Sequence, residues 1–338
     1  MSAERFVIIG NGPAGNEAAE ILREKSPRSR VTIFGKESIR SYKPHLLPDV
    51  IAGKVDQENI FMKPDSYFRE KDIQLRLGQR VKHVDFNKRQ VLLEHREVVS
   101  FDGLIIATGG KPRIPEPLEV FEDVMLTLKT AFDAQLWVDR LSKTDSVLII
   151  GGDLTSLSLT RALINLGKKV FFIVNAESFW PLPFNERLST EIQARLCEKG
   201  VEVLNSRTVR RLTQLSDTSV EVETDCEKIR VGVVGAFFGL VPDVKFLVRS
   251  GLDIDRGILV DENLQTRFAN VYAAGDCAQV YNPVIKDYWV SIGYENARTL
   301  GRIAALNMLG EMLSVKSSPE SIFSLNGVKA NTSWWMEF

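Results

Sequence analysis

The sequence is poor in the features that mark several protein classes. Its 338 residues contain only three cysteines, Cys197, Cys226 and Cys277, whose spacing matches neither a metal site nor a redox-active pair. The three histidines are scattered along the chain, which argues against a metal site. No apolar run approaches the ~18 residues that a membrane helix requires. We therefore expect no membrane span and no chemistry at a cysteine pair.

An excess of charge of one sign is also lacking. Lys and Arg total 43 and Asp and Glu total 44, so the charge balance gives no reason to expect a nucleic acid or an anionic membrane as partner. Residues 1–5 lead almost directly into the apolar residues 6–9, which leaves no room for a secretory signal, so we expect a cytoplasmic protein. A hydrophobic content of 44% and a charged content of 26% fit a soluble globular chain.

The N-terminal residues show a strand–turn–helix–strand pattern. Residues 6–9 form a short apolar run typical of a buried parallel strand, and residues 16–25 have helical spacing. Residues 31–34 read as the next strand. The turn between the first strand and the helix is rich in glycine.

That turn carries a complete G-x-G-x-x-G sequence. Gly10 permits a tight turn, Gly12 lets the backbone approach a pyrophosphate, and Gly15 lets the helix pack closely on the strand. The start of the helix attracts an anion. The motif predicts a bound dinucleotide, and the alternative is a glycine-rich turn of purely structural use.

A second unit of the same kind follows about 140 residues later. Strand patterns at residues 147–150 and 170–174 flank a helical pattern at residues 154–166. Pro112, Pro115 and Pro117 indicate a linker before this unit. A third stretch, residues 257–276, is rich in strand formers and is followed by a helical pattern over residues 295–309.

Several motifs over about 310 residues then resemble one family. Residues 104–109 end in Ala-Thr-Gly, and residues 111–113 read Lys-Pro-Arg. Residues 266–276 read T-x-x-x-x-V-Y-A-x-G-D, and residues 297–302 are similar to the family's last helix. The chain resembles the FAD-dependent pyridine-nucleotide–disulfide oxidoreductases, in the branch of the ferredoxin and rubredoxin reductases, the flavin part of assimilatory nitrite reductase and apoptosis-inducing factor.

The resemblance implies that FAD is the cofactor. In the family the arginine at Arg113 touches FAD, the aspartate at Asp276 binds the ribityl chain, and the start of the last helix faces the flavin pyrimidine ring. An ordinary helix N-cap is the alternative role of Asp276. The implied FAD site comprises Gly10, Gly12, Pro13, Ala14, Gly15, Glu37, Lys43, Val81, Thr108, Gly109, Arg113, Gly275, Asp276, Tyr294, Glu295 and Ala297.

Two of these positions depart from the expected pattern. The acid that holds the adenosine ribose should lie about 20 residues beyond the glycines, where Glu37 is the nearest carboxylate and could equally be a solvated turn residue. Residues 41–53 resemble the family's R-P-P-L-S-K…A-G segment, with Lys43 in place of its arginine and Pro48 in place of its lysine. The family's dithiol and its single peroxidatic cysteine are both missing.

The fingerprint of the second unit, which in the family binds NAD(P)H, departs further. Its site would comprise Gly151, Gly152, Asp153 and Ser156, and the last two replace glycines. An anion at Asp153 repels phosphates and a side chain crowds them. Ser158 replaces a family glutamate that pairs with the lysine replaced by Pro48. The expected ribose acid falls at Val174 or Asn175.

Two outcomes stay open for this unit. Either it keeps its fold and has weakened or lost NAD(P)H binding, or its loop rearranges and binds the cofactor in another way.

The sequence thus predicts an α/β fold with two Rossmann-like dinucleotide-binding domains, the second inserted in the first. We expect an FAD-binding domain at residues 1–112 plus 245–313, an NAD(P)-binding-like domain at 113–244, and a tail at 314–338 that is the remnant of an interface domain and a candidate docking site for a partner subunit. The predicted function is an FAD-dependent oxidoreductase that passes electrons through non-covalent flavin to a protein or small acceptor, with NAD(P)H as the family donor. The alternative is an FAD-binding electron-transfer or structural subunit of a larger complex that does not use NAD(P)H.

Overall fold

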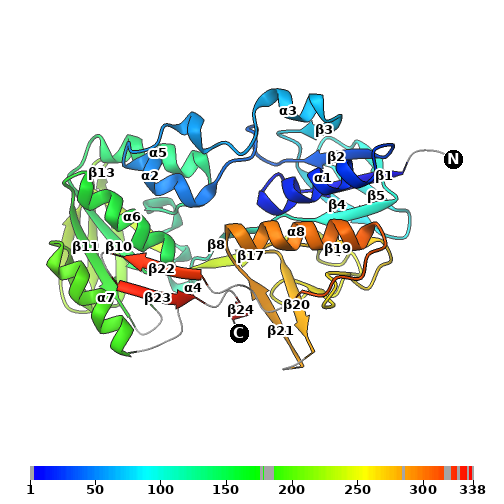
Figure 1. The fold of residues 1–338 in the computed structure, drawn as a ribbon. Helices are drawn as coiled ribbons and strands as arrows, with labels where there is room; N and C mark the ends of the chain where they lie inside the picture. Colours follow the sequence, from blue (N-terminus) through cyan, green and yellow to red (C-terminus); the bar gives the residue numbers. More distant parts are fainter. Residues whose placement is uncertain are drawn as a thin grey trace.

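The computed structural model describes residues 4–175, 178, 186–283, 286–315, 321–325, 328–332 and 335–336, the last three stretches by their backbone. Two parallel five-stranded sheets, each covered by helices, lie side by side (Figure 1). The predicted α/β fold with parallel sheets is confirmed.

The first sheet has the strand order β19-β7-β1-β2-β3, and all of its pairs are parallel. Its strands are β1 (Arg5–Ile9), β2 (Arg30–Phe34), β3 (Ile73–Arg76), β7 (Gly103–Ile106) and β19 (Val271–Ala273). Helices α1 (Pro13–Lys25) and α8 (Tyr294–Met308) run side by side over one face (Figure 1). A Cβ atom at Gly301 of α8 would lie 2.1 Å from the Ala14 oxygen, so only glycine allows this close packing.

Helix α1 starts three residues before the helical pattern that the sequence shows. Gly12 is its N-cap and Pro13 its first residue. Proline suits this position because its fixed φ matches a helix and its missing N–H would have no partner there. Side-chain periodicity does not reveal such a start, because the backbone preferences of Gly12 and Pro13 determine it.

The second sheet has the order β12-β11-β10-β16-β9 and is also parallel. Its strands are β9 (Met125–Leu126), β10 (Ser146–Gly151), β11 (Lys169–Val174), β12 (Glu202–Asn205) and β16 (Val233–Phe237). The helices around it are α5 (Ala131–Leu141), α6 (Leu154–Asn165) and α7 (Glu186–Glu198). Strands β10 and β11 are apolar and buried, as strands of a sheet covered on both faces should be.

The remaining strands form small sheets around these two layers. They are β4 (Val81–Asp85), β5 (Gln90–Leu93), β6 (Val98–Ser100), β8 (Gly110–Pro112), β13 (Val209–Ser216), β14 (Ser219–Thr224), β15 (Lys228–Val231), β17 (Leu240–Pro242), β18 (Ile258–Val260), β20 (Ala278–Asn282), β21 (Asp287–Ser291), β22 (Ser321–Leu325), β23 (Val328–Thr332) and β24 (Trp335–Met336). Within the described part of the tail, residues 321–325, 328–332 and 335–336 are strands. Strands β22 and β23 pair with each other, and β24 pairs with β21.

The short helices are α2 (Leu47–Ile51), α3 (Asp65–Glu70), α4 (Glu116–Glu119) and the 3-10 turns η1 (Pro44–Leu46), η2 (Gln57–Ile60), η3 (Glu122–Val124) and η4 (Lys245–Leu247). Although α2 follows the first βαβ unit in the chain, it packs on α5 and α6 of the second (Figure 1). Its Leu47 and Ile51 are buried in the second core. The chain crosses between the two sheets through the antiparallel pair of β8 and β17.

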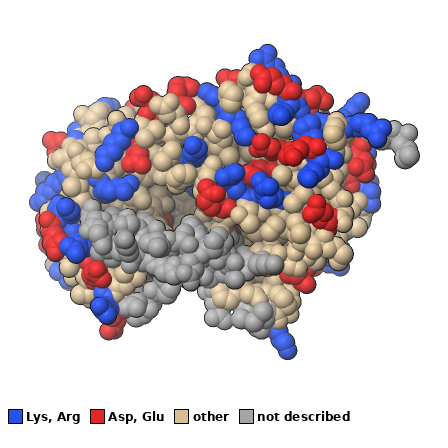
Figure 2. Space-filling model, in the orientation of Figure 1, with Lys and Arg blue, Asp and Glu red and all other residues tan. Residues whose placement is uncertain are grey.

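The surface of the molecule carries charges of both signs. Figure 2 shows basic and acidic side chains interspersed over one face, without a patch of a single sign. Within the described ranges no helix is long and apolar enough to cross a membrane. The same ranges hold no cluster of three or more His, Cys, Asp and Glu residues that could bind a metal ion.

Candidate functional site

The glycine turn after β1 forms an open cradle at the end of the first sheet. A Cβ atom at Gly10, whose φ is +121°, would lie 2.0 Å from the Ala107 oxygen, and one at Gly15 would lie 2.0 Å from the Gly10 oxygen. These two positions therefore require glycine for packing. At Gly12 an added Cβ atom meets no described atom within 4 Å. The start of α1 thus faces space that a ligand can fill.

Three neighbouring parallel strands bring the other predicted segments to the same edge. Ile9 of β1 pairs with Ile106 of β7, and Ile106 pairs with Ala273 of β19. The residues after these strands, including Thr108, Gly109 and Gly275, therefore lie together at one edge of the sheet. Gly109 also leaves open space at its Cβ position.

Asp276 lies at this edge, and its side chain meets a residue from the second sheet. Strand β20 follows it, so the alternative of a helix N-cap is wrong. An Asp276 oxygen lies 3.4 Å from Lys129 Nζ, and the side chains are 14% and 27% exposed. Lys129 lies in the loop before α5, where its backbone N–H donates to Asp133 at 2.8 Å. Sequence reasoning missed Lys129, because 147 residues separate the pair.

Glu37 has a partner within the chain. It is exposed, and its carboxylate accepts a hydrogen bond from the Tyr42 hydroxyl at 3.0 Å. The same hydroxyl accepts the Ala131 backbone N–H at 3.1 Å, at the start of α5. This network joins the two units, and the predicted ribose contact of Glu37 stays a prediction.

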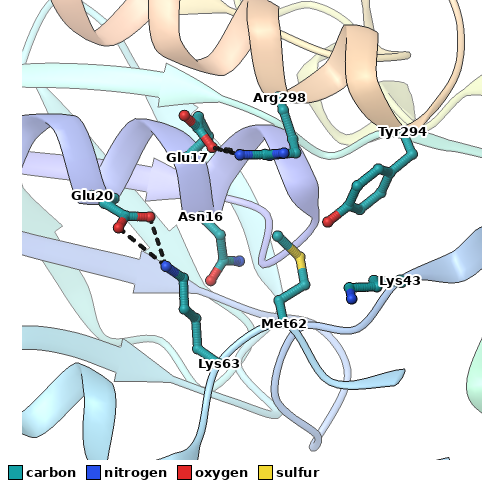
Figure 3. A pocket seen from close by; sticks show the side chains of 8 residues that line it. All are labelled: Asn16, Glu17, Glu20, Lys43, Met62, Lys63, Tyr294 and Arg298. Carbon is teal, nitrogen blue, oxygen red and sulfur yellow. Dashed lines mark hydrogen bonds and ion pairs between the residues drawn. The ribbon is translucent and has the colours of Figure 1, made fainter. Parts of the chain in front are cut away.

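A cavity of about 180 Å³ opens beside Lys43 and Tyr294, two residues of the predicted FAD site (Figure 3). It is bounded by Asn16, Glu17, Glu20, Lys43, Met62, Lys63, Tyr294 and Arg298. The acids are neutralised, since Glu17 pairs with Arg298 at 3.0 Å and Glu20 with Lys63 at 2.9 Å. Lys43 forms no ion pair with any residue that the structure describes, so its charge is not neutralised as those of Lys63 and Arg298 are.

Asn16, which the sequence analysis did not select, adds an unsatisfied acceptor to this cavity. The residue is 5% exposed, and its Nδ2 donates to the Asn11 oxygen, to Asn11 Oδ1 and to the Gly12 oxygen at 3.0–3.1 Å. Three acceptors fix the nitrogen on that side of the amide. Oδ1 is consequently the other atom, and it has no hydrogen-bond partner among the described residues. A buried acceptor of this kind calls for a donor from a ligand or water.

The other residues of the predicted FAD site lie on several elements and differ in burial. Tyr294 begins α8 and its ring lies 4.7 Å from the His45 ring, while Glu295 is exposed and pairs with Arg298 at 3.3 Å. Arg113 is exposed just after β8. Val81 begins β4 and is buried. Pro13, Ala14 and Ala297 lie where α1 and α8 start.

In the second unit the corresponding helix start is filled. Asp153 is the N-cap of α6, and its Oδ1 accepts the Ser156 backbone N–H at 2.9 Å. Its Oδ2 accepts the Gly239 backbone N–H at 3.2 Å. Val174 is buried at the end of β11, and Asn175 is exposed. Pro48 and Ser158 lie on α2 and α6, which pack together.

The buried Asp153 carboxyl should make stability depend on pH. Burial raises its pKa from 3.8 to about 6, although the N–H groups of Ser156 and Gly239 oppose the rise. As pH rises from about 4 to about 6, the carboxyl of the unfolded chain ionises before that of the folded chain. The free energy of unfolding therefore falls across this window and does not change further, through this group, above it. We expect the free energy of unfolding of Asp153→Asn, relative to that of the natural protein, to rise by about 3 kcal/mol across this window, at 1.36 kcal/mol per pKa unit.

Chemical denaturation of both proteins at a series of pH values measures this difference, and groups common to both cancel. A difference that does not change with pH would show that Asp153 titrates normally.

Comparisons with known proteins show the family and the fold. The family model described as pyridine nucleotide-disulphide oxidoreductase matches residues 4–296. The chain is 27% identical over 312 residues to the ferredoxin–NAD(+) reductase component of the anthranilate 1,2-dioxygenase system of Burkholderia cepacia, covering 92% of this chain and 77% of that protein. It is 25% identical to the assimilatory nitrate reductase electron transfer subunit of Bacillus subtilis, covering 82% of this chain but 36% of that protein.

Among solved structures, the covalent putidaredoxin reductase–putidaredoxin complex matches with a TM-score of 0.89 at 23% identity, over 97% of this chain and 81% of the other. The ferredoxin reductase for the CYP199A2 system from Rhodopseudomonas palustris matches with a TM-score of 0.85 at 21% identity, over 96% and 80%. These likenesses show the fold. The family model covers most of the chain, and the chain is therefore an oxidoreductase of the pyridine nucleotide-disulphide oxidoreductase family.

Proposed function

We propose that the chain is an FAD-dependent oxidoreductase that passes electrons through a non-covalently bound flavin to a ferredoxin- or rubredoxin-type protein. The observation that carries the proposal is the open cradle at Gly12, which stands at the start of α1 beside Asp276. The names of relatives add the acceptor, since they include ferredoxin–NAD(+) and rubredoxin–NAD(+) reductases.

The residues at this edge fit FAD. The first N–H groups of α1 have no side-chain cap and suit a pyrophosphate. Asp276 supplies carboxylate acceptors for hydroxyl groups, and the start of α8 stabilises negative charge near it. FAD, when bound, supplies the redox chemistry, and the residues at the edge bind and orient it. We place the FAD-binding domain at residues 1–112 plus 245–313.

The cavity in Figure 3 offers the acceptor a route to the flavin. Two of the residues around it, Lys43 and Tyr294, belong to the predicted FAD site. Lys43 favours an anionic group, and the Asn16 oxygen favours a hydrogen-bond donor. In the proposed function the edge of the acceptor protein covers this opening.

The test starts with the purified protein. We expect it to be yellow, with one FAD per chain released by denaturation. Chemically reduced protein mixed anaerobically with an oxidised ferredoxin or rubredoxin should reduce the iron protein. A colourless protein that takes up no FAD on reconstitution would refute the flavin assignment, and a flavoprotein that reduces neither iron protein would refute the acceptor class.

The cysteines should be dispensable for this activity. Cys197 and Cys226 are exposed and far from the edge in sequence, while Cys277 is buried and its thiol donates to the Ile106 and Ala274 oxygens. Burial raises the pKa of Cys277, which keeps it a poorly reactive thiol. A triple Cys→Ala variant should keep its FAD content and its rate of iron-protein reduction. Loss of electron transfer with FAD still bound would reveal a thiol step.

A further inference from the structure

We propose that Asp153 closes the second dinucleotide unit to NADH and NADPH by placing its own carboxylate where a phosphate would bind at the start of α6. The inference rests on the proposed function and deepens it, since it concerns the electron donor. It makes Asp153 a specificity-determining residue.

The hydrogen-bond donors around the start of α6 are already occupied. A helix start binds a phosphate through backbone N–H groups that lack partners in the helix. At the start of α6 the Ser156 N–H donates to Asp153 at 2.9 Å, and the Gly239 N–H, in the loop after β16, donates to the same carboxylate at 3.2 Å. A phosphate at this position would have to displace the carboxylate from both groups.

The contrast with α1 shows that the filling is specific to the second unit. Both helices follow the first strand of a parallel unit through a glycine turn. The N-cap of α1 is Gly12, which makes no side-chain cap bond and meets no described atom within 4 Å of an added Cβ. The N-cap of α6 is Asp153, which is 7% exposed and makes two bonds to backbone N–H groups. The N-cap position is therefore open in the first unit and filled by a carboxylate in the second.

The glycine turn before α6 has close neighbours. A Cβ atom at Gly152 would lie 3.1 Å from the Phe172 ring and 3.3 Å from Ser178 Cβ. Ser178 is held there, because its hydroxyl donates to the Gly151 oxygen at 2.5 Å and accepts the Asn175 N–H at 2.9 Å. Ser156 is fully buried and its hydroxyl donates to the Asp153 oxygen at 2.6 Å. The turn before α6 is therefore closely packed at Gly152, and the helix start itself is filled by Asp153 and Ser156.

The size of the effect follows from the lost bonds. A nucleotide must break two charge-assisted hydrogen bonds and then leave a carboxylate beside its own phosphate charge. Bonds of this type and like-charge repulsion together correspond to roughly two decades or more in dissociation constant. In the proposed function the flavin is then reduced by a donor that does not require this unit, and the unit keeps a structural role through Lys129.

Two substitutions separate occupancy from charge. Asp153→Gly empties the position and loses little helix stability, because glycine is a tolerated N-cap. Asp153→Asn removes the charge but still fills the position and can cap through its amide oxygen. Calorimetric titration of each FAD-loaded protein with NADH and with NADPH gives the dissociation constants, and stopped-flow spectroscopy gives flavin reduction.

We expect no saturation of the natural protein or of Asp153→Asn at micromolar nucleotide. Asp153→Gly, and more so Asp153→Gly combined with Ser156→Gly, should bind one nucleotide about 100-fold more tightly. Micromolar binding by the natural protein would overturn the inference, as would equal gains for the glycine and asparagine variants, or no gain in a folded glycine variant. FAD content and reduction of the iron protein by chemically reduced enzyme test the proposed function separately, since neither measurement involves a pyridine nucleotide.

Discussion

Gly12→Leu should abolish stoichiometric FAD binding and leave the fold intact. Gly12 has φ −83°, which any residue adopts, and an added Cβ meets no described atom within 4 Å. The leucine side chain would project into the space where the pyrophosphate meets the N–H groups of α1. Loss of several charge-assisted hydrogen bonds should raise the dissociation constant of FAD by about 100-fold or more. Visible absorbance of the purified variant and titration of the apoprotein with FAD measure the loss.

Graded and contrasting substitutions make this result specific. Gly12→Ala adds one methyl group and should retain part of the affinity. Gly15→Leu should instead damage folding, because its Cβ would overlap the Gly10 oxygen at 2.0 Å. Circular dichroism and thermal unfolding of the apoproteins distinguish the two kinds of defect. Full FAD occupancy in Gly12→Leu would mean that the dinucleotide does not lie over α1.

Local features of this fold were predictable because they depend on neighbours in sequence. The strand at β1, the glycine turn and the helix after it fall within about 20 residues, and their spacing follows from the geometry of a strand–turn–helix unit. The same holds for β10, α6 and β11. Helix α1 starts three residues before the pattern over residues 16–25, because Gly12 and Pro13 set its start through backbone preferences and not through side-chain periodicity.

Contacts between the two units were not predictable from a single sequence. Lys129 reaches Asp276 across 147 residues, and Leu47 packs into the core of the second sheet. Neither contact has a local pattern, because each depends on how the sheets are placed beside each other. Asp153 is an intermediate case. The sequence shows that an anion replaces glycine, but only the structure shows that the carboxylate takes the N–H groups of Ser156 and Gly239.

Asp276→Ala should weaken FAD binding strongly, and Lys129→Met should weaken it less. The Asp276 carboxylate lies just beyond β19 with 14% of its side chain exposed, so the hydrogen bonds that we propose it makes to ligand hydroxyls would be shielded from water. Loss of one or two charge-assisted bonds corresponds to roughly a 10- to 100-fold rise in the dissociation constant. Lys129, at 3.4 Å from Asp276, acts by holding that carboxylate in place, so its loss should cost roughly one decade or less.

A double-mutant cycle tests this order of effects. If Lys129 acts through Asp276, then Lys129→Met should have little further effect once Asp276 is alanine, so the two free-energy changes should not add. Asp276→Asn keeps one acceptor oxygen and should fall between the natural protein and the alanine variant. The matched control is Lys168→Met, which removes a partly buried lysine paired with Asp145 at 3.0 Å in the second unit and should leave FAD affinity unchanged. Additive effects of Asp276→Ala and Lys129→Met would show that Lys129 contacts FAD independently, and unchanged affinity in a folded Asp276→Ala variant would remove Asp276 from the flavin site.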